Sequence, residues 1–445
     1  MPIPIFNLAD EAGLSAANAL LGRLRLGGAM VAGGKSGGAG DPAAAVAHVI
    51  DAVARDGDAA LIELTERFDK VKLAPDRIRV SADELAAAHR SADPKFLAAA
   101  RVAIANIREY QQHIKPQPPA PLTRPGMSES LRFVPLERVG CYVPGGTAPL
   151  VSSVMMLVGP AQAAGVKQIA VACPPRANGD INPAVLAVCH ELGISEVYRV
   201  GGAQAIAALA LGTRTIRKVD KIVGPGNLYV QLAKKQLYGQ VDIDSFAGPS
   251  EVLILADGSA PPMWVAADLL SQAEHNPGCG LLVTPDANLA AEVRRCVGEL
   301  VSRVSRRAAV EQSLAEWSAI LLVGSMDEAI DWANRIAPEH LQVIAADEAK
   351  IASRIHNAGV IFVGAYTPVA TGDYIAGSSH VLPTGGTARY FAGLSVFDFL
   401  RPVSVVHYDR AGLAAAAGDI ETLASVEGLD AHTLSVRIRL EPNRL

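Results

Sequence analysis

The feature that most constrains this chain is a repeated alternation of short apolar strands and helices between residues 132 and 255. "LERVGCYV", "KQIAVACPP" and "SEVYRVGG" read as strands, and helical patterns such as "NPAVLAVCHELG" separate them. A second series runs from 251 to 364, with strand-like "EVLILADG", "GCGLLVTPD", "AILLVG" and "AGVIFVG". Apolar strands that alternate with helices predict parallel sheets covered on both faces. The chain is therefore expected to be an α/β protein with more than one parallel sheet.

Glycine-rich turns follow predicted strands of the first series at 145–146, 201–202 and 224–226. They lie at the carboxyl ends of strands, where open α/β sheets bind ligands, so they predict a ligand site. The earlier "GGKS" at 33–36 is different, because a phosphate-binding loop needs a glycine where Ala29 stands and no strand precedes it. Residues 1–40 are therefore expected to be an N-terminal extension that ends in a linker.

Composition and charge exclude several classes of function. At 445 residues the chain is too long for one core, and its net charge of −5 gives no electrostatic reason to expect nucleic acid or an anionic membrane as partner. The most apolar run, "APLVSSVMMLVGPAQAAG", is broken by Gly159-Pro160, which argues against a membrane span. The N-terminus lacks a secretory signal, and five widely spaced cysteines without C-x-x-C suggest free thiols in the cytoplasm.

The stretch "SQAEHNPG" at 271–278 places Gln272 and His275 near the end of a helix that Pro261-Pro262 should open. Residues three apart share one face of a helical turn. An amide oxygen and a neutral imidazole on one face can bind a metal ion together. The alternative is that His275 interacts with the carbonyl groups at the end of the helix while Gln272 is solvated.

Three further segments carry residues that could act with this pair. In "APEHLQV" the adjacent Glu339 and His340 suit proton transfer, although a Pro-Glu-His can also be the first turn of a helix. In "TGDYIAGSSHVLPTGG" Asp373 is a candidate oxygen ligand, unless the segment is a solvated loop. In "VEGLDAH" Glu427 and His432 lie near the end of the C-terminal helix, where a solvated role is the alternative.

Together with the segments "YVPGGTAPL", "VGGAQAIAALA", "KIVGPGN" and "AGPSEVL", these motifs closely resemble the histidinol dehydrogenase family, in the family's order, from about residue 41 to 440. The resemblance implies two Rossmann-like parallel-sheet domains with small N- and C-terminal extensions in an intertwined homodimer. It divides the chain into an N-terminal extension (1–40), a main domain (41–131 with 251–394), a second domain that contacts NAD (132–250) and a C-terminal dimerisation segment (395–445).

The resemblance also implies an activity, the oxidation of L-histidinol to L-histidine in two NAD-dependent steps through a retained aldehyde. Zinc would be bound by Gln272, His275, Asp373 and His432. His340 would accept the alcohol proton, and Glu339 would activate the water that hydrates the aldehyde. The substrate would contact the four zinc ligands and His340 together with Ser250, His380 and Glu427. NAD would contact Tyr142, Gln204 and Asn227. Glu427 and His432 would complete the site of the partner subunit.

Three alternatives differ from this expectation. One is a zinc dehydrogenase of the same fold that acts on another small polyol, such as a sulfonated propanediol. Another makes Cys141 or Cys279 a nucleophile toward the aldehyde, although the sequence places no recognisable base beside either. A third is a non-catalytic metal-binding or scaffold protein, which would be expected to have lost at least one of the candidate ligands or the acid–base pair.

Overall fold

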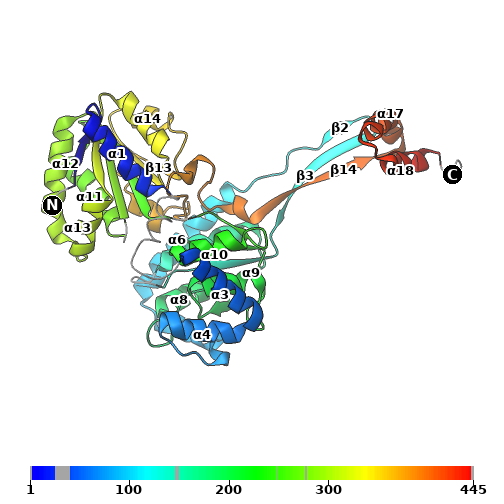
Figure 1. Ribbon diagram of the computed structural model, residues 1–445, viewed down its shortest axis with the longest axis horizontal. Coiled ribbons are helices and arrows are strands. Elements are labelled where there is room, and N and C mark those ends of the chain that lie inside the picture. Colours follow the sequence, from blue (N-terminus) through cyan, green and yellow to red (C-terminus); the bar gives the residue numbers. More distant parts are fainter. Residues whose placement is uncertain (1–2, 26–40, 146–149, 247, 276–277, 442–445) are drawn as a thin grey trace. The chain divides into compact units, whose positions relative to one another are not determined.

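The computed structural model describes residues 3–25, 41–145, 150–246, 248–275 and 278–441 (Figure 1). The chain forms two compact units, Met1–Ile114 with Glu137–Asp398 and Lys115–Leu136 with Phe399–Leu445. The expected linker at 27–40, with its "GGKS", lies outside the described residues.

The first unit contains a six-stranded sheet in the order β1-β11-β10-β9-β12-β13, with every neighbouring pair parallel. Side chains of a strand alternate between the faces of its sheet, so Val252 and Ile254 pack under one layer of helices while Leu253 and Leu255 pack under the other. The strands are β1 (Ile5–Asn7), β9 (Ser250–Ala256), β10 (Gly278–Thr284), β11 (Ala319–Leu322), β12 (His340–Ile344) and β13 (Val360–Val363). The accompanying helices are α1 (Glu11–Leu24), α11 (Pro262–Ala273), α12 (Ala287–Leu300), α13 (Arg307–Glu316), α14 (Met326–Ile336), α15 (Glu348–Ala352) and α16 (Val369–Tyr374).

The same unit contains a five-stranded parallel sheet in the order β6-β5-β4-β7-β8. Its strands are β4 (Arg138–Tyr142), β5 (Gln168–Ala172), β6 (Glu196–Tyr198), β7 (Lys221–Val223) and β8 (Asp242–Ile243). The helices that follow these strands are α7 (Val151–Ala164), α8 (Pro183–Glu191), α9 (Gly202–Leu211) and α10 (Leu228–Leu237). The predicted alternation of strands and helices is therefore present in both sheets.

The helices before residue 114 belong with the five-stranded sheet. Helix α3 (Pro42–Asp56) packs on α9 and α10, α5 (Ala82–Ser91) packs on α8, and α6 (Pro94–His113) packs on α7. Val46, Val49 and Val53 of α3 join Ile206 and Leu209 of α9 in one core, together with residues of α4 (Asp58–Asp69). The expected grouping of 41–131 with 251–394 does not follow this packing. Residues 1–40 were expected to form a separate extension, but β1 near its start is an edge strand of the six-stranded sheet.

The second unit is an antiparallel three-stranded sheet in the order β14-β3-β2, with two helices. Strand β14 (Leu400–Tyr408) pairs along its whole length with β3 (Met127–Pro135), which also pairs with β2 (Leu122–Arg124). Residues 122–135 therefore belong with the C-terminal segment, whereas 122–131 were expected in the main domain and 132–135 in the second domain. Helices α17 (Arg410–Glu427) and α18 (Asp430–Leu440) follow, separated by Gly428 in a left-handed conformation.

The apolar run that ends near residue 165 forms the 14-residue helix α7, which has Pro160 inside it. Across the described part of the chain, no helix combines the length and the hydropathy needed to cross a bilayer. Short 3-10 turns complete the described elements at η1 (Pro75–Arg77), η2 (Val301–Arg303), η3 (Thr387–Arg389) and η4 (Val396–Phe399).

Candidate active site

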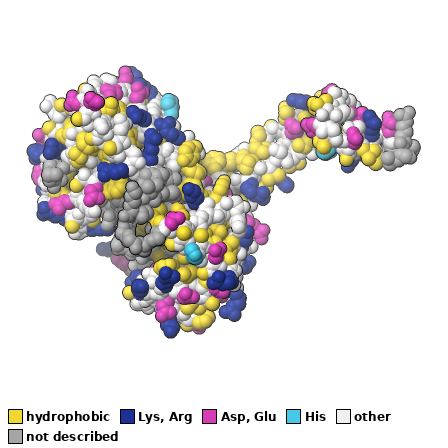
Figure 2. Space-filling view, viewed as in Figure 1, with side chains coloured by type: hydrophobic (Ala, Val, Ile, Leu, Met, Phe, Trp, Pro, Cys, Tyr) yellow, Lys and Arg dark blue, Asp and Glu magenta, His cyan; other side chains and the backbone are white. Residues whose placement is uncertain are grey.

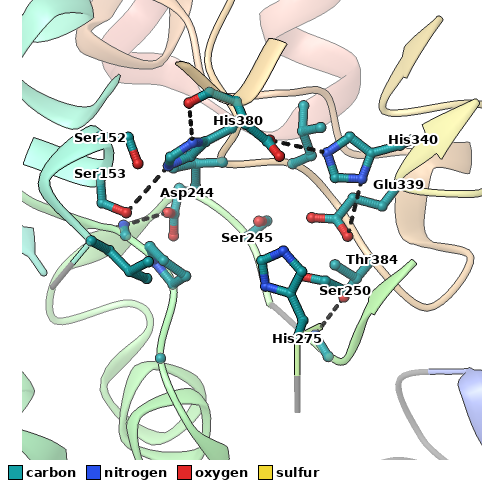
Figure 3. A pocket seen from close by; sticks show the side chains of 18 of the residues that line it. Ser152, Ser153, Asp244, Ser245, Ser250, His275, Glu339, His340, His380 and Thr384 are labelled. Atoms are coloured by element: carbon teal, nitrogen blue, oxygen red, sulfur yellow. Dashed lines mark hydrogen bonds and ion pairs between the residues drawn. The ribbon is translucent and has the colours of Figure 1, made fainter. Parts of the chain in front are cut away.

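A cavity of about 160 Å³ in the first unit receives residues from both parallel sheets (Figure 3). The five-stranded sheet contributes residues 224–226 and Asp244, which follow the carboxyl ends of β7 and β8. The six-stranded sheet contributes Ser250 and His340, which begin β9 and β12. The cavity thus lies at the carboxyl edge of one sheet, where the glycine-rich turns predicted a ligand site, and at the amino edge of the other.

Glu339 and His340 stand at the start of β12. Helix α14 ends at a left-handed Ala337, Pro338 follows, and the apolar residues after His340 form a buried strand between β9 and β13. The alternative that Pro-Glu-His opens a helix is therefore wrong. Both side chains are nearly buried, with 5% and 4% exposure.

The contacts of His340 fix the orientation of its ring. Nδ1 lies 3.0 Å from the backbone oxygen of Glu251 and 3.5 Å from Oε2 of Glu339. Because a carbonyl oxygen can only accept, Nδ1 carries a hydrogen. Nε2 is buried without a hydrogen-bond partner and lies 3.8 Å from Oδ1 of Asp373. Nε2 is therefore the ring atom available to a ligand in the cavity.

The surroundings of this pair change both pKa values. Burial raises the pKa of Glu339 to about 7, although the neighbouring imidazole favours its charged form. Burial opposes the charged form of His340, but the carboxylates of Glu339 and Asp373 outweigh it and raise the pKa of the imidazole to about 9. A carboxyl group whose pKa is near neutral pH, in contact with an imidazole that can hold a second proton, is suited to transfer a proton to or from a bound molecule.

Three of the four predicted metal ligands line this cavity. Gln272 occupies the last turn of α11, is 1% exposed and has no hydrogen-bond partner for its Nε2. His275 follows the helix, its backbone N–H donating to Gln272, and its ring points toward Ser250 and Glu339 in Figure 3. Asp373 lies in the short helix α16 and lines the cavity, so the alternative of a solvated loop does not apply to it. Asn276 and Pro277, which follow His275 in the sequence, lie outside the described residues.

These donors fit a divalent metal ion in part. Burial lowers the pKa of His275, which favours the neutral form that metals bind. Burial disfavours the charged form of Asp373, but the nearby imidazole of His340 outweighs this effect and lowers the pKa of the carboxyl group, so the carboxylate is ionised at neutral pH. Within the described residues no cluster of three or more His, Cys, Asp or Glu side chains could hold a metal. The amide of Gln272 would have to be a ligand, with a further donor from elsewhere.

Glu427 and His432 belong to the second unit. Glu427 is the last residue of α17 and His432 lies near the start of α18, and both are exposed. The cavity lining comes from the first unit alone.

Of the predicted substrate contacts, Ser250 and His380 line the cavity. His380 is held on both sides, because Nδ1 lies 3.1 Å from the backbone oxygen of Asp373 and Nε2 lies 3.2 Å from the hydroxyl of Ser153 (Figure 3). Ser153, near the start of α7, was not predicted from the sequence. A serine in an apolar helical pattern gave no signal for it.

The three predicted NAD contacts lie around the carboxyl edge of the five-stranded sheet, and none of them lines the cavity. Tyr142 is buried and accepts a hydrogen bond from the backbone N–H of Gly202. Gln204 is 1% exposed and its Nε2 has no hydrogen-bond partner. The exposed Asn227 caps α10 by accepting from the N–H groups of the next turn.

A buried ion pair beside these loops was also missed. Nζ of Lys234 lies 2.7 Å from Oδ1 of Asp244 and donates to the backbone oxygen of Gly224, whose N–H donates to Oδ2 of Asp244. The pair therefore holds both backbone groups of Gly224, which lines the cavity. Only glycine suits this position, because φ is +123° and an added Cβ would meet the backbone oxygen of Tyr142 at 2.1 Å.

The two cysteines considered as nucleophiles are placed differently from a reactive thiol. Cys141 and Cys279 have no exposed surface, and neither lines the cavity. Burial raises the pKa of both thiols well above their ordinary value. A thiolate mechanism has no support in this geometry.

The fold and the cavity define a class of protein, an α/β enzyme with a buried carboxylate–imidazole pair beside candidate ligands for a divalent metal. Comparison with known proteins narrows the class. The sequence model of the histidinol dehydrogenase family matches residues 37–440. The chain therefore belongs to the histidinol dehydrogenase family.

Individual relatives agree with this assignment. The chain is 48% identical to the histidinol dehydrogenase of Moorella thermoacetica over 90% of its own length and 94% of the relative's, and 47% identical to that of Synechococcus over 89% and 92%. Its structure is similar to the crystal structure of histidinol dehydrogenase from Elizabethkingia anophelis, with a TM-score of 0.88, 37% identity and 96% of each chain covered.

Proposed function

We propose that this protein oxidises L-histidinol to L-histidine through bound histidinal, with two molecules of NAD⁺ reduced. The observation that carries the proposal is the position of Glu339 and His340 in the same cavity as Gln272, His275 and Asp373. The membership of the chain in the family supplies the substrate.

The proposed cofactors follow from the donors of the chain. Gln272, His275, Asp373 and His432 would hold Zn²⁺, which would orient the substrate through its amine and imidazole nitrogens. NAD⁺ would accept a hydride in each step and contact Tyr142, Gln204 and Asn227. The buried, partnerless Nε2 of Gln204 supports the NAD⁺ assignment, because an acceptor atom of a ligand would give this donor a partner.

The chain's own groups would move the protons. The neutral form of His340, which becomes more populated as the pH rises toward the imidazole pKa of about 9, keeps its hydrogen on Nδ1 and would accept the proton of the alcohol at Nε2 as the hydride leaves. Glu339 would take a proton from the water that adds to the aldehyde, and the hydrate would then donate the second hydride. Ser250 and His380 would contact the substrate within the cavity. To retain histidinal, the site would have to admit water only at the position where Glu339 can activate it.

The active form is proposed to be a cytoplasmic homodimer in which Glu427 and His432 complete the site of the partner subunit. The first unit supplies three of the four proposed metal ligands to the cavity, and the fourth is exposed on a separate unit. On that unit the apolar side chains of Leu423 and Val426 are 66% and 84% exposed. Such exposure is expected of a surface that a second chain covers. The five cysteines are free, in keeping with a reducing compartment.

The central experiment measures the NADH formed per L-histidinol consumed, with and without a chelator. The proposal predicts two NADH per histidinol, loss of activity on chelation and recovery with zinc. Dihydroxypropane sulfonate serves as the comparison substrate, and a preference for it would show that the protein acts on a different small polyol.

The shared site has its own test. His275→Asn and His432→Asn should each be inactive as homodimers, but mixed dimers should regain activity because one of their two sites is intact. Absence of activity in the mixture, or a fully active monomer with four metal ligands of its own, would rule out the shared site.

A further inference from the structure

Glu251 lies within the motif "AGPSEVL", but neither the sequence analysis nor the proposed reaction gives this buried acid a role. It is the second residue of β9, directly after Ser250, and is 2% exposed. Ionisable side chains are rarely buried to this extent without a charged partner of opposite sign or a function. The groups that face it are Glu339 and His340 on β12 and Cys279 on β10.

Glu251 and Glu339 exchange hydrogen bonds across two neighbouring strands. The backbone N–H of Glu251 donates to Oε2 of Glu339 at 2.9 Å, and the backbone N–H of Glu339 donates to Oε1 of Glu251 at 3.2 Å. The backbone oxygen of Glu251 also accepts from Nδ1 of His340. Residue 251 therefore contacts both members of the proposed acid–base pair.

The same carboxyl group ties a second segment to this site. Oε1 of Glu251 also accepts from the N–H of Gly385 at 3.0 Å. Gly385 has a φ of +62° and follows Thr384, which lines the cavity. One oxygen atom thus holds the start of β12 and the turn after His380 in fixed positions.

Ionising both of these neighbouring, buried carboxyl groups would be strongly unfavourable in free energy, so one of them retains a proton. Burial, followed by the charge of Glu339, raises the pKa of Glu251 to about 8. Nδ1 of His340 lies 3.5 Å from Oε2 of Glu339, so the charge of the imidazole favours the anion on Glu339. The proton of the pair therefore resides on Glu251 near neutral pH. Because Oε1 accepts two N–H groups, the proton belongs on Oε2.

We propose that Glu251 is a positioning residue of the proposed reaction: as a neutral carboxylic acid it fixes the backbone of Glu339 and Gly385 and leaves the single negative charge of the pair on Glu339. This inference rests on the proposed function for its kinetic part. It assigns no contact between Glu251 and the substrate.

The protonation state is tested without turnover, by infrared difference spectroscopy of the metal-loaded enzyme between pH 5 and 9. A buried carboxylic-acid C=O band should persist above pH 7 in the unmodified protein and be absent in Glu251→Gln. In Glu339→Gln the band should disappear at lower pH, because the neighbouring charge that raises the pKa is gone. A spectrum without the band, or a band that Glu251→Gln leaves in place, overturns the proposal.

The positioning role is tested by the oxidation of supplied histidinal. Glu251→Gln keeps an uncharged acceptor for both N–H groups, so the acidic limb of its pH–rate profile should coincide with that of the unmodified enzyme. Glu251→Leu removes the acceptor and should lower kcat at least 10-fold with a much smaller change in KM. A displacement of the acidic limb by half a pH unit or more in Glu251→Gln would mean that residue 251 carries charge in the working enzyme, and would refute the proposal.

A matched control is Glu328→Gln, because Glu328 also accepts a backbone N–H at the end of a strand of the same sheet but lies outside the cavity. It should change neither the band nor the profile. If Glu251→Leu does not fold, the pH–rate profile of Glu251→Gln and the infrared spectra still test the proposal. If the unmodified enzyme fails to oxidise histidinol, the proposed function fails while the infrared result stands on its own.

Discussion

The buried ion pair between Lys234 and Asp244 allows a prediction whose size follows from the structure. The side chains are 1% and 5% exposed and their charged atoms are 2.7 Å apart. Lys234→Met removes the cation and leaves the carboxylate of Asp244 buried without compensation. Breaking a buried pair on one side typically lowers the free energy of unfolding by about 3–5 kcal/mol. At roughly 2–4 °C per kcal/mol for a domain of this size, Tm should fall by on the order of 10 °C.

The assay is differential scanning calorimetry of matched variants. Lys235→Met is the control, because Lys235 is the next residue of α10 and is exposed, and it should move Tm by no more than about 1 °C. In the double variant Lys234→Met/Asp244→Asn the buried charge is gone, but an acceptor for the N–H of Gly224 remains. The double variant should therefore be more stable than Lys234→Met alone. Equal Tm values for Lys234→Met and Lys235→Met, or a double variant less stable than the single one, would refute this reasoning.

The remaining predictions concern the site and the acid limit of stability. Glu339→Gln should slow the oxidation of supplied histidinal by about 10²–10⁴-fold, the range for loss of a general base, and slow the first hydride transfer much less; equal losses would contradict its role toward water. His275→Asn should lose zinc and turnover but keep its circular dichroism spectrum, and stoichiometric zinc in this variant would remove His275 from the ligand set. The bonds from Arg138 hold the pKa of Glu196 at about 2, below its ordinary value of 4.5, so this pair stabilises the fold fully above pH 5 and loses its contribution as the pH falls toward 2. The loss should be about 1–2 kcal/mol after solvent screening, and Glu196→Gln should flatten the pH dependence of urea unfolding between pH 5 and 3; parallel curves would contradict it.

Local patterns predicted the two sheets because their strands are apolar on both faces and are separated by amphipathic helices. They did not predict which sheet the helices of residues 41–113 would cover. The apolar stripe of α3 indicates a buried face, but its partner α9 lies about 150 residues further along the chain. Strand β12 was missed for a related reason, since Pro338 and Glu339 resemble a helix start and the following strand is only 5 residues long.

The site residues were predicted more completely than their arrangement. Gln272, His275, Glu339 and Asp373 were found because imidazole, amide and carboxylate groups interrupt apolar segments, and the cavity contains all four. The rule that α/β sheets bind ligands at carboxyl ends accounts for the turn at 224–226 but not for the six-stranded sheet, which presents its amino edge. Which edge faces the cavity depends on how the two sheets pack within the first unit.

Glu251 illustrates the part that local patterns cannot reach. In "SEVLILA" a single acid at the start of an apolar strand is expected to lie at the surface. Its burial arises because β12 enters the sheet directly beside β9 and places Glu339, 88 residues away in sequence, next to it. If Glu251 lay on an edge strand, water would solvate it and it would ionise like an ordinary acid. The order of strands in the sheet therefore sets whether Glu251 and Glu339 must hold a proton between them, and a change in that order would alter the chemistry of the site without altering any of its motifs.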